Sequence, residues 1–360
     1  MDELRSEIGE RNKIIMELEK DLRKLEIKND LRNSYIKRPE THHVDCGRVL
    51  SGDKKYLEAV GGINRVKMLE NKNLNMSCSA IMSRILPSDL ELKPLKKGVA
   101  FARIVYTDYE MIEKQVSMSY HPQNAFCFAI DRKAPARFHE RLRAMAECLP
   151  NVLLLPDEKP VDSSGHNVNL AHYNCLRALI NKPGWSYAIL LQNHDVITKS
   201  VYEMEQIYEW LGGANDVEIT PEAGRVDKKF EWDPRSLKLF RNESGIDEKV
   251  LNTTMKFAKG AAQGSLSRAA VDWMVRTADL STYIAQWNKG MMPSFDYSII
   301  DCTAELLYNR TFLGQEDHKL EEDYYTNMVN VLYHKHHLEN DYKLNCTPSY
   351  KRWAERQYPV

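Results

Sequence analysis

The sequence predicts an α/β protein with a mostly parallel sheet flanked by helices, and three observations lead to this class. The apolar run Tyr187–Leu191 does not alternate with polar residues, and it stops at a polar cluster that contains Asp195. Such a run is typical of a central parallel strand that is buried on both faces. Strand and helix patterns also alternate along the chain from residue 98 onwards. Finally, 360 residues with 43% hydrophobic content are enough to bury a core of this kind.

The individual elements follow one another in strand–helix order. Strands are expected at residues 99–107, 126–130, 152–155 and 187–191. Helices are expected at residues 109–118, 134–148, 168–180 and 200–211, and the last one ends at Gly212-Gly213, a common helix stop. Units of these lengths form right-handed crossovers between parallel strands. After residue 213 the pattern weakens to loop and short strand at 219–260, a helix at 267–277 and mostly polar helix beyond 306.

The N-terminal 33 residues have a different pattern from the rest of the chain. They are highly charged and carry a short seam of apolar residues at roughly heptad spacing, namely Leu4, Ile8, Ile15, Leu18, Leu22 and Leu25. A single solvated helix and a stalk that dimerises are both compatible with this seam. We therefore expect a helical stem at 1–40, a helical connecting region at 41–97, the α/β domain at 98–312 and a polar tail at 313–360.

Composition and motifs exclude several classes of function. The 50 basic and 51 acidic residues nearly balance, which argues against a non-specific nucleic-acid binder. No apolar run approaches the roughly 18 residues of a membrane span. The sequence has no GxGxxG after a strand, no GxxxxGK[ST], no GxSxG and no HExxH. His334, His336 and His337 form a cluster, but on an exposed helix such residues are usually solvated, so no metal site is expected.

The cysteines leave the redox state open on these grounds alone. The seven cysteines contain no CxxC pair, so scattered thiols and three disulfides with one cysteine left over are both compatible with the spacing. A mild excess of Asn-x-Ser/Thr sequons favours the disulfides and a secretory route. These sequons are at Asn75, Asn242, Asn252, Asn309 and Asn345.

Charged residues follow two of the expected strands. Asp131 with Arg132 and Lys133 ends the strand at 126–130, and Asp195 ends the strand at 187–191. Ligands of open α/β sheets bind at the carboxyl ends of strands, where a carboxylate can accept hydrogen bonds from a ribose or uracil and a cation can offset phosphate charge. An ordinary helix N-cap is the alternative role for each carboxylate. The residues alone thus indicate an α/β protein with a candidate nucleotide site.

Several segments, taken in order, resemble the core-2/I-branching β-1,6-N-acetylglucosaminyltransferases of glycosyltransferase family 14. The matching segments are Asp45–Asp53, Ile104–Tyr106, His121–Asn124 with Cys127 and Asp131, Ala146–Val152, Trp185–Asp195, Gly264–Arg268 and Phe295–Cys302. The resemblance covers about residues 44–312. It implies a GT-A-type fold, a Golgi type II membrane protein, and metal-independent transfer of N-acetylglucosamine from UDP-GlcNAc to a glycoprotein O-glycan with inversion.

The resemblance also assigns roles to residues of this sequence. It implies disulfides Cys46–Cys302, Cys78–Cys148 and Cys127–Cys175, which leave Cys346 single and suit an oxidising compartment. The donor-binding residues that it implies are Ile104, Val105, Tyr106, Asp131, Arg132, Lys133, Ser163 and Lys289. The acceptor-binding residues that it implies are Glu218, Arg225 and Lys229.

The sequence departs from the family pattern in two places. The Asp-Glu motif that supplies the family's catalytic base should follow the helix at 267–277, but the chain passes almost directly from Trp287 to Met292, so we name no base. The family's membrane anchor is also missing, and Met1 lies in what resembles the stem. A truncated isoform, or an inactive relative that binds sugar or nucleotide, is therefore the alternative to an active transferase. A cytosolic α/β enzyme of another chemistry is the third interpretation.

Overall fold

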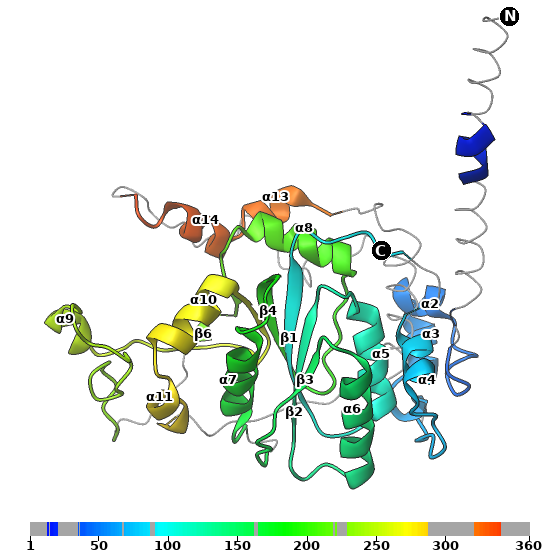
Figure 1. Ribbon diagram of the computed structural model, residues 1–360, viewed down its shortest axis with the longest axis horizontal. Helices are drawn as coiled ribbons and strands as arrows, with labels where there is room; N and C mark the ends of the chain where they lie inside the picture. The colour runs from blue at the N-terminus through cyan, green and yellow to red at the C-terminus, as the bar shows by residue number, and fades with distance from the viewer. Residues whose placement is uncertain are drawn as a thin grey trace, which may run out of the picture.

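A six-stranded sheet with helices on both faces forms the centre of the molecule in the computed structural model (Figure 1). The structure describes residues 13, 15–20, 35, 37–66, 68–86, 91–161, 165–218, 220–221, 229–286 and 320–339. Within these residues, no helix is long and apolar enough to cross a lipid bilayer.

The sheet is mixed but mostly parallel, with strand order β3-β2-β1-β4-β8-β5. Its four parallel strands are β1 (Gly98–Val105), β2 (Ala125–Ile130), β3 (Val152–Leu154) and β4 (Trp185–Leu191). Strand β8 (Gly264–Ser267) runs antiparallel to β4, and β5 (Asp216–Val217) runs antiparallel to β8. The predicted fold class and all four predicted strands are confirmed. Strands β1 and β2 are buried along their whole length, as their unbroken apolar sequences predict.

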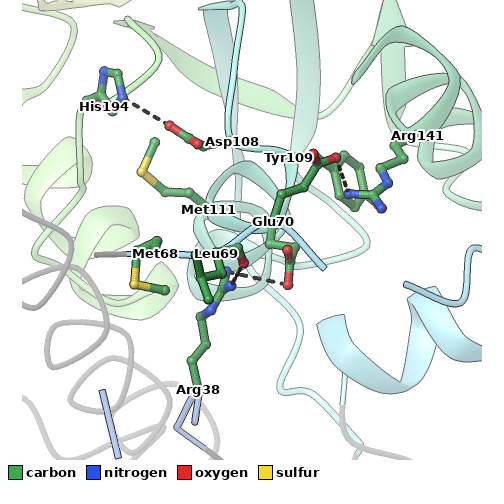
Figure 2. A pocket seen from close by; sticks show the side chains of 10 residues that line it. Arg38, Met68, Leu69, Glu70, Asp108, Tyr109, Met111, Arg141 and His194 are labelled. Carbon is green, nitrogen blue, oxygen red and sulfur yellow. Dashed lines mark hydrogen bonds and ion pairs between the residues drawn. The ribbon is translucent and has the colours of Figure 1, made fainter. Parts of the chain in front are cut away.

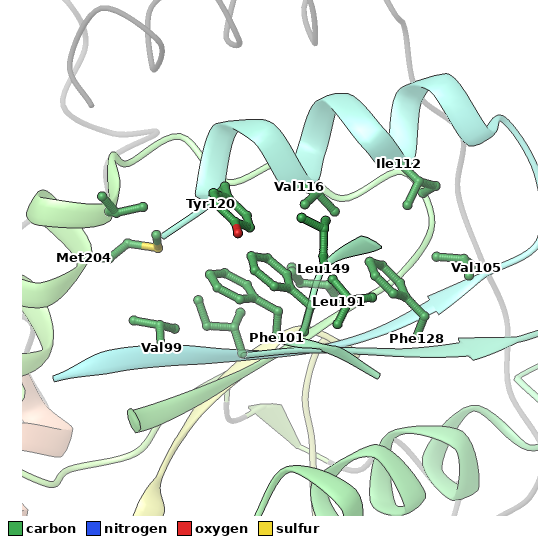
Figure 3. Packing of buried hydrophobic residues seen from close by; sticks show 14 of the residues in the cluster. Val99, Phe101, Val105, Ile112, Val116, Tyr120, Phe128, Leu149, Leu191 and Met204 are labelled. Carbon is green, nitrogen blue, oxygen red and sulfur yellow. The ribbon is translucent and has the colours of Figure 1, made fainter. Parts of the chain in front are cut away.

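One face of the sheet packs against α5 (Tyr109–Ser119) and α6 (Ala136–Cys148). Figure 3 shows Ile112, Val116 and Tyr120 of the α5 segment above Phe101 and Phe128 of the sheet. Helix α4 (Cys78–Ile85) covers the outer side of α5 and α6, and α8 (Val201–Leu211) joins the same core. Because β1 alternates its side chains between two cores, it is buried from both sides.

The opposite face packs against α7 (Val168–Leu179) and α10 (Arg268–Asp272). Trp185 anchors this face: its side chain is 1% exposed, its indole Nε1 donates to the carbonyl oxygen of Leu179 at 3.0 Å, and the guanidinium of Arg268 lies 4.3 Å above the ring. The predicted helix at 267–277 is α10 followed by one π-helical turn, Trp273–Thr277.

Two helix ends follow from their sequences. Helix α8 begins with a capping box, in which the Ser200 hydroxyl accepts from the backbone N–H of Glu203 and the Glu203 carboxylate accepts from the N–H of Ser200. It stops at Gly212, whose φ of 59° is left-handed and therefore favours glycine.

The remaining described elements are short. They are α2 (Cys46–Leu50), α3 (Lys54–Val60), the 3₁₀ turn Gly62–Asn64, α9 (Glu248–Leu251), α11 (Ser281–Gln286), α13 (Glu322–Thr326), α14 (Val329–His336) and the two-stranded pair β6 (Thr220–Pro221) with β7 (Ala258–Lys259). Residues 15–20 of the predicted stem are helical, with Ile15 and Leu18 exposed; the other seam positions lie outside the described residues.

Two of the disulfides implied by the resemblance are confirmed. Cys78 bonds Cys148 and so joins α4 to the end of α6, and Cys127 bonds Cys175 and so joins β2 to α7. Cys46 is also disulfide-bonded, and its predicted partner Cys302 lies outside the described residues.

Candidate active site

The carboxyl ends of β1, β2, β4 and β5 meet along one edge of the sheet. The first three strands are mutually parallel, and β5 shares their direction because it is antiparallel to β8, which is itself antiparallel to β4. Along this edge the chain places Asp131 after β2, Tyr106 after β1, Asn193–Asp195 after β4 and Glu218 after β5. Ligands of open α/β sheets bind at such an edge, so this is the candidate site.

The loop Gln192–Asp195 at the end of β4 is held by hydrogen bonds along its length. Nη1 of Arg103 donates to the carbonyl oxygens of Gln192 and Asp195, at 2.8 Å each. The side-chain oxygen of Asn193 accepts from the backbone N–H groups of Tyr106 at 2.7 Å and Thr107 at 3.2 Å. The amide of Gln115 on α5 donates to the carbonyl of Asn193. This loop therefore fixes the end of β1 as well as its own backbone.

Asp195 takes part in this internal network. Its carboxylate, on a residue that is 8% exposed, accepts from the backbone N–H of Gln192 at 2.6 Å and from the amide of Gln263 at 2.8 Å. Burial lowers the pKa of Arg103 to about 10, and the negative charge of Asp195 opposes that shift. Asp195 does lie at the strand end as predicted, with its oxygens bonded to protein donors.

Asp131 has a similar local arrangement beside two exposed cations. Its Oδ1 accepts from the backbone N–H groups of Lys133 at 2.9 Å and Val161 at 3.3 Å. The Lys133 ammonium lies 3.9 Å from the other carboxylate oxygen, and the side chains of Arg132 and Lys133 are exposed. This corner of the edge can therefore present positive charge to an anionic ligand.

Tyr106, His194 and Asp108 form an accessible group between Asp131 and Asp195 along this edge. The Tyr106 and His194 rings contact edge-to-face with centroids 5.8 Å apart, and Nε2 of His194 lies 3.6 Å from the Asp108 carboxylate. Asp108 has a left-handed φ of 56°, which is uncommon for a residue other than glycine. Burial, together with the negative charges of Asp108 and Asp131, raises the pKa of Tyr106 above its usual value.

A cavity of about 150 Å³ opens beside this group (Figure 2). His194 and Asp108 lie at one end of it and Arg38 lies at the other, with Met68, Leu69 and Met111 between them. Both arginines of its wall are paired, Arg141 with Glu70 at 3.2 Å and Arg38 with Glu110 at 3.4 Å.

Comparison with known proteins identifies the family. The family model described as Core-2/I-Branching enzyme matches residues 99–354, which is most of the chain. This protein belongs to the core-2/I-branching enzyme family. The chain is similar to beta-1,3-galactosyl-O-glycosyl-glycoprotein beta-1,6-N-acetylglucosaminyltransferase 3 of Homo sapiens, with 22% identity over 75% of this chain and 69% of the relative. It is also similar to the beta-1,3-galactosyl-O-glycosyl-glycoprotein beta-1,6-N-acetylglucosaminyltransferase of Bovine herpesvirus 4 (strain DN-599), with 24% identity over 76% of this chain and 69% of the relative.

The core-2/I-branching enzyme fold brings some of the predicted site residues to the edge and buries others. The side chains of Ile104 and Val105 face the two cores and are 5% and 0% exposed, and the carbonyl of Val105 accepts from the N–H of Asp131. From this stretch only Tyr106 exposes its side chain substantially, at 40%. Glu218 is exposed at the end of β5, and Lys229 is exposed in the segment that precedes α9.

Other predictions fall outside the site or outside the described residues. Ser163, Arg225 and Lys289 lie outside the described residues. In the histidine cluster, His336 pairs with Glu339 at 2.7 Å, and Nδ1 of His337 faces the carbonyl of His334 at 3.0 Å. Across the described part of the chain, no group of three His, Cys, Asp or Glu side chains has a metal-binding arrangement.

Sequence reasoning did not select His194, Asp108 or Asn193. The polar cluster Gln192–Asp195 directly after a buried strand is the signal that could locate His194 and Asn193, but its only carboxylate is Asp195. Asp108 gave no signal, because its position beside His194 depends on its left-handed backbone.

Proposed function

We propose that this protein is a glycosyltransferase that transfers N-acetylglucosamine from UDP-GlcNAc to a hydroxyl of a glycoprotein O-glycan, with inversion. The observation that carries the proposal is the single edge on which Tyr106 and Asp131 lie on one side of the β4 loop and Glu218 lies on the other. Membership of the core-2/I-branching family and the names of the relatives support the same reaction.

In this proposal the donor lies over the ends of β1 and β2. Asp131 would orient the nucleotide, while Arg132 and Lys133, both exposed, would offset phosphate charge. Ser163 and Lys289 are assigned to the donor by resemblance. The acceptor lies towards β5, where the exposed carboxylate of Glu218 can accept hydrogen bonds from adjacent sugar hydroxyls. Arg225 and Lys229 are assigned to the acceptor by resemblance.

Three further properties belong to the same proposal. Basic side chains take the place of a divalent cation, so transfer needs no metal. The protein acts in the Golgi lumen, where disulfides persist. The exposed Ile15 and Leu18 belong to a seam that pairs two stems in a homodimer, which light scattering on the full chain would test.

A transfer assay tests the reaction. Purified protein is incubated with UDP-GlcNAc and a core-1 disaccharide, with and without EDTA, and NMR spectroscopy determines the anomeric configuration of the product. We expect a β-linked product in both conditions. Asp131→Asn should weaken UDP-GlcNAc binding in a titration, and Glu218→Gln should raise the KM for the acceptor.

A matched control is Glu322→Gln, which changes an exposed carboxylate on α13 and should alter neither parameter. Donor binding without product from any O-glycan acceptor would favour the second candidate function, a non-catalytic relative that binds the nucleotide sugar. The specific observation in favour of that candidate is the lack of any glutamate in residues 249–304, where the family's Asp-Glu motif is expected. Failure to bind UDP-GlcNAc would reject both functions.

A further inference from the structure

The exposed carboxylate of Glu218 is carried by a very short strand. It follows β5, which consists of Asp216 and Val217 alone and pairs with Ser265 and Gly264 of β8. So short a strand fixes a side chain weakly on its own, and the segments that pack against its two ends decide where the carboxylate lies. The contacts at those ends therefore bear on how Glu218 meets an acceptor sugar.

The backbone at Gly260 lies directly against Glu218. A Cβ on Gly260, which follows β7, would overlap the carbonyl oxygen of Glu218 and would lie 3.8 Å from the Cβ of Glu218. Only a residue without a side chain allows this approach. The φ of Gly260 is not left-handed, so the collision with Glu218, rather than backbone strain, opposes alanine at this position.

The other end of β5 is held by α14. Nδ2 of Asn330 donates to the backbone carbonyl of Asn215 at 2.8 Å, and the side-chain oxygen of Asn215 accepts from the backbone N–H of Ser267 at 2.8 Å. Val331, the neighbour of Asn330, is 0% exposed in the core that α14 shares with α8, and Figure 1 shows the two helices on the same side of the molecule. Helix α14 thus fixes the residue from which β5 begins.

We propose that Gly260 and Asn330 are positioning residues for the acceptor, and that both act through Glu218. The inference rests on the proposed function. The contact at Gly260 holds the backbone of Glu218 from the side of β7, and the bond from Asn330 holds the start of β5. The donor side, with Tyr106 and Asp131, lies across β4 in the strand order, so these two residues act on acceptor binding and not on donor binding.

A purely structural role is the alternative, and it predicts different measurements. A residue that only stabilises the fold lowers the melting temperature without selecting one substrate. A positioning residue weakens acceptor binding, leaves donor binding intact, and loses its effect once the carboxylate of Glu218 has been removed. A double-mutant cycle with Glu218→Ala separates the two roles, because residues that act through one group are not additive.

The test titrates a core-1 disaccharide into the UDP-saturated protein and compares Gly260→Ala with wild type. We expect the acceptor Kd of Gly260→Ala to rise about tenfold, the size expected for loss of one hydrogen bond to a charged group. The UDP-GlcNAc Kd should stay within about twofold. In the transfer assay the acceptor KM should rise to the same extent, with kcat within about twofold. On the Glu218→Ala background, Gly260→Ala should change the acceptor Kd by less than about twofold.

Asn330→Asp tests the other end of β5. It keeps the size of the side chain but replaces the donor to the carbonyl of Asn215 with an acceptor. The acceptor Kd should again rise by about tenfold, and again only while Glu218 is present. This variant adds no bulk, so it carries the test if melting curves show that Gly260→Ala does not fold.

Gly61→Ala is the matched control. A Cβ on Gly61 would lie 2.7 Å from the carbonyl oxygen of Leu57, a comparable collision with backbone, but at the end of α3. It should leave the acceptor Kd unchanged even where the melting temperature falls.

Three outcomes would overturn the inference. They are an unchanged acceptor Kd in the folded Gly260→Ala and Asn330→Asp variants, an equal effect of these changes with and without Glu218, and an unchanged acceptor Kd in Glu218→Ala. Because binding is measured directly, a wild-type chain that binds the disaccharide without turnover would reject only the transfer reaction, and the same cycle would still decide the role of Gly260 and Asn330.

Discussion

Arg103 and Asp195 meet beneath the candidate site, where Nη1 of Arg103 donates to the backbone carbonyl of Asp195 at 2.8 Å. The guanidinium belongs to a residue that is 6% exposed, in the middle of the parallel sheet. Nη1 of Arg103 also donates to the carbonyl of Gln192, so one side chain bonds both ends of the β4 loop. The loop carries His194 and Asn193, so the geometry of the site depends on this buried cation.

Removing that cation should destabilise the protein. Arg103→Met leaves the buried carbonyl oxygen of Asp195 without its guanidinium donor and removes one of two donors from the carbonyl of Gln192. It also leaves the Asp195 carboxylate buried, so the free energy of unfolding should fall by about 2–4 kcal/mol. Urea denaturation measures the change. Arg137→Met, which removes a cation whose side chain is 48% exposed, should change it by less than about 0.5 kcal/mol. Equal stability of Arg103→Met and wild type would show that the loop does not need the guanidinium.

Asn193 should couple stability to donor binding. Asn193→Ala removes the oxygen that accepts from the N–H groups of Tyr106 and Thr107, and each unsatisfied group costs about 1–3 kcal/mol. Since Tyr106 is then no longer held at the edge, affinity for UDP-GlcNAc should also fall, as isothermal titration would measure. Asn193→Asp keeps an acceptor oxygen and should recover most of that affinity. Unchanged affinity of Asn193→Ala for UDP-GlcNAc would show that the position of Tyr106 does not affect donor binding.

His172 should make stability depend on pH. It is 4% exposed, its Nε2 lies 3.0 Å from the carbonyl of Leu191, and burial lowers its pKa. The unfolded chain therefore binds a proton below about pH 6.5 that the folded protein does not bind. The contribution of His172 to the free energy of unfolding should be constant above about pH 6.5. Below that pH it should fall by up to about 1.4 kcal/mol per pH unit.

Denaturant titrations at several pH values test this dependence. His172→Gln should flatten the slope below pH 6.5, and His42→Gln, which changes an exposed histidine, should not. Burial also lowers the pKa of His121, so part of the slope should remain in His172→Gln. A slope equal to that of wild type in His172→Gln would contradict the assignment.

The disulfide between Cys78 and Cys148 should contribute substantially to stability. It closes a loop with a sequence separation of 70 residues, so the double variant Cys78→Ala/Cys148→Ala should lose about 4 kcal/mol in the chain-entropy model. Thermal and urea melts measure the loss. Peptide mapping without reduction should also recover Cys46 linked to Cys302 and find Cys346 as a thiol. Recovery of Cys46 with any other partner would refute the pairing carried over from the family.

The three sequons in the described residues should carry glycans. Asn75, Asn242 and Asn252 are all exposed, so each is open to modification in a secretory compartment. Protein secreted from mammalian cells should lose one glycan mass with each single Asn→Gln variant at these positions. The sequons at Asn309 and Asn345 lie outside the described residues and are expected to behave alike. An intact mass equal to that of the bare polypeptide would show that the secreted protein carries no glycans.

The sequence predicted the parallel strands well because their residues carry a local signal. The runs at 126–130 and 187–191 are apolar without alternation, which is typical of a strand buried on both faces. Strand β8 has no such signal: Gly-Ser-Leu-Ser is short and half polar, and its place in the sheet depends on its hydrogen bonds to β4. The antiparallel half of the sheet was therefore not predictable from pattern alone.

The site was predictable in position but not in detail. The end of an apolar run placed Asp131 and Asp195 at the carboxyl edge of the sheet, where the structure has them. The bonding of Asp195 depends on Gln263, 68 residues away, and such a partner leaves no local pattern. The same reason explains why the cavity was not foreseen, since its wall joins Arg38, the segment 68–70 and the turn at Asp108.

The bond between Cys78 and Cys148 has a consequence for that cavity. Residues 68–70, which form part of its wall, lie ten residues or fewer before the cysteine that is fastened to α6, and Arg141 of the opposite wall belongs to α6 itself. The disulfide thus connects the chain that follows residues 68–70 to the helix that carries Arg141. A chain made in a reducing compartment would lose this covalent link between two parts of the cavity wall.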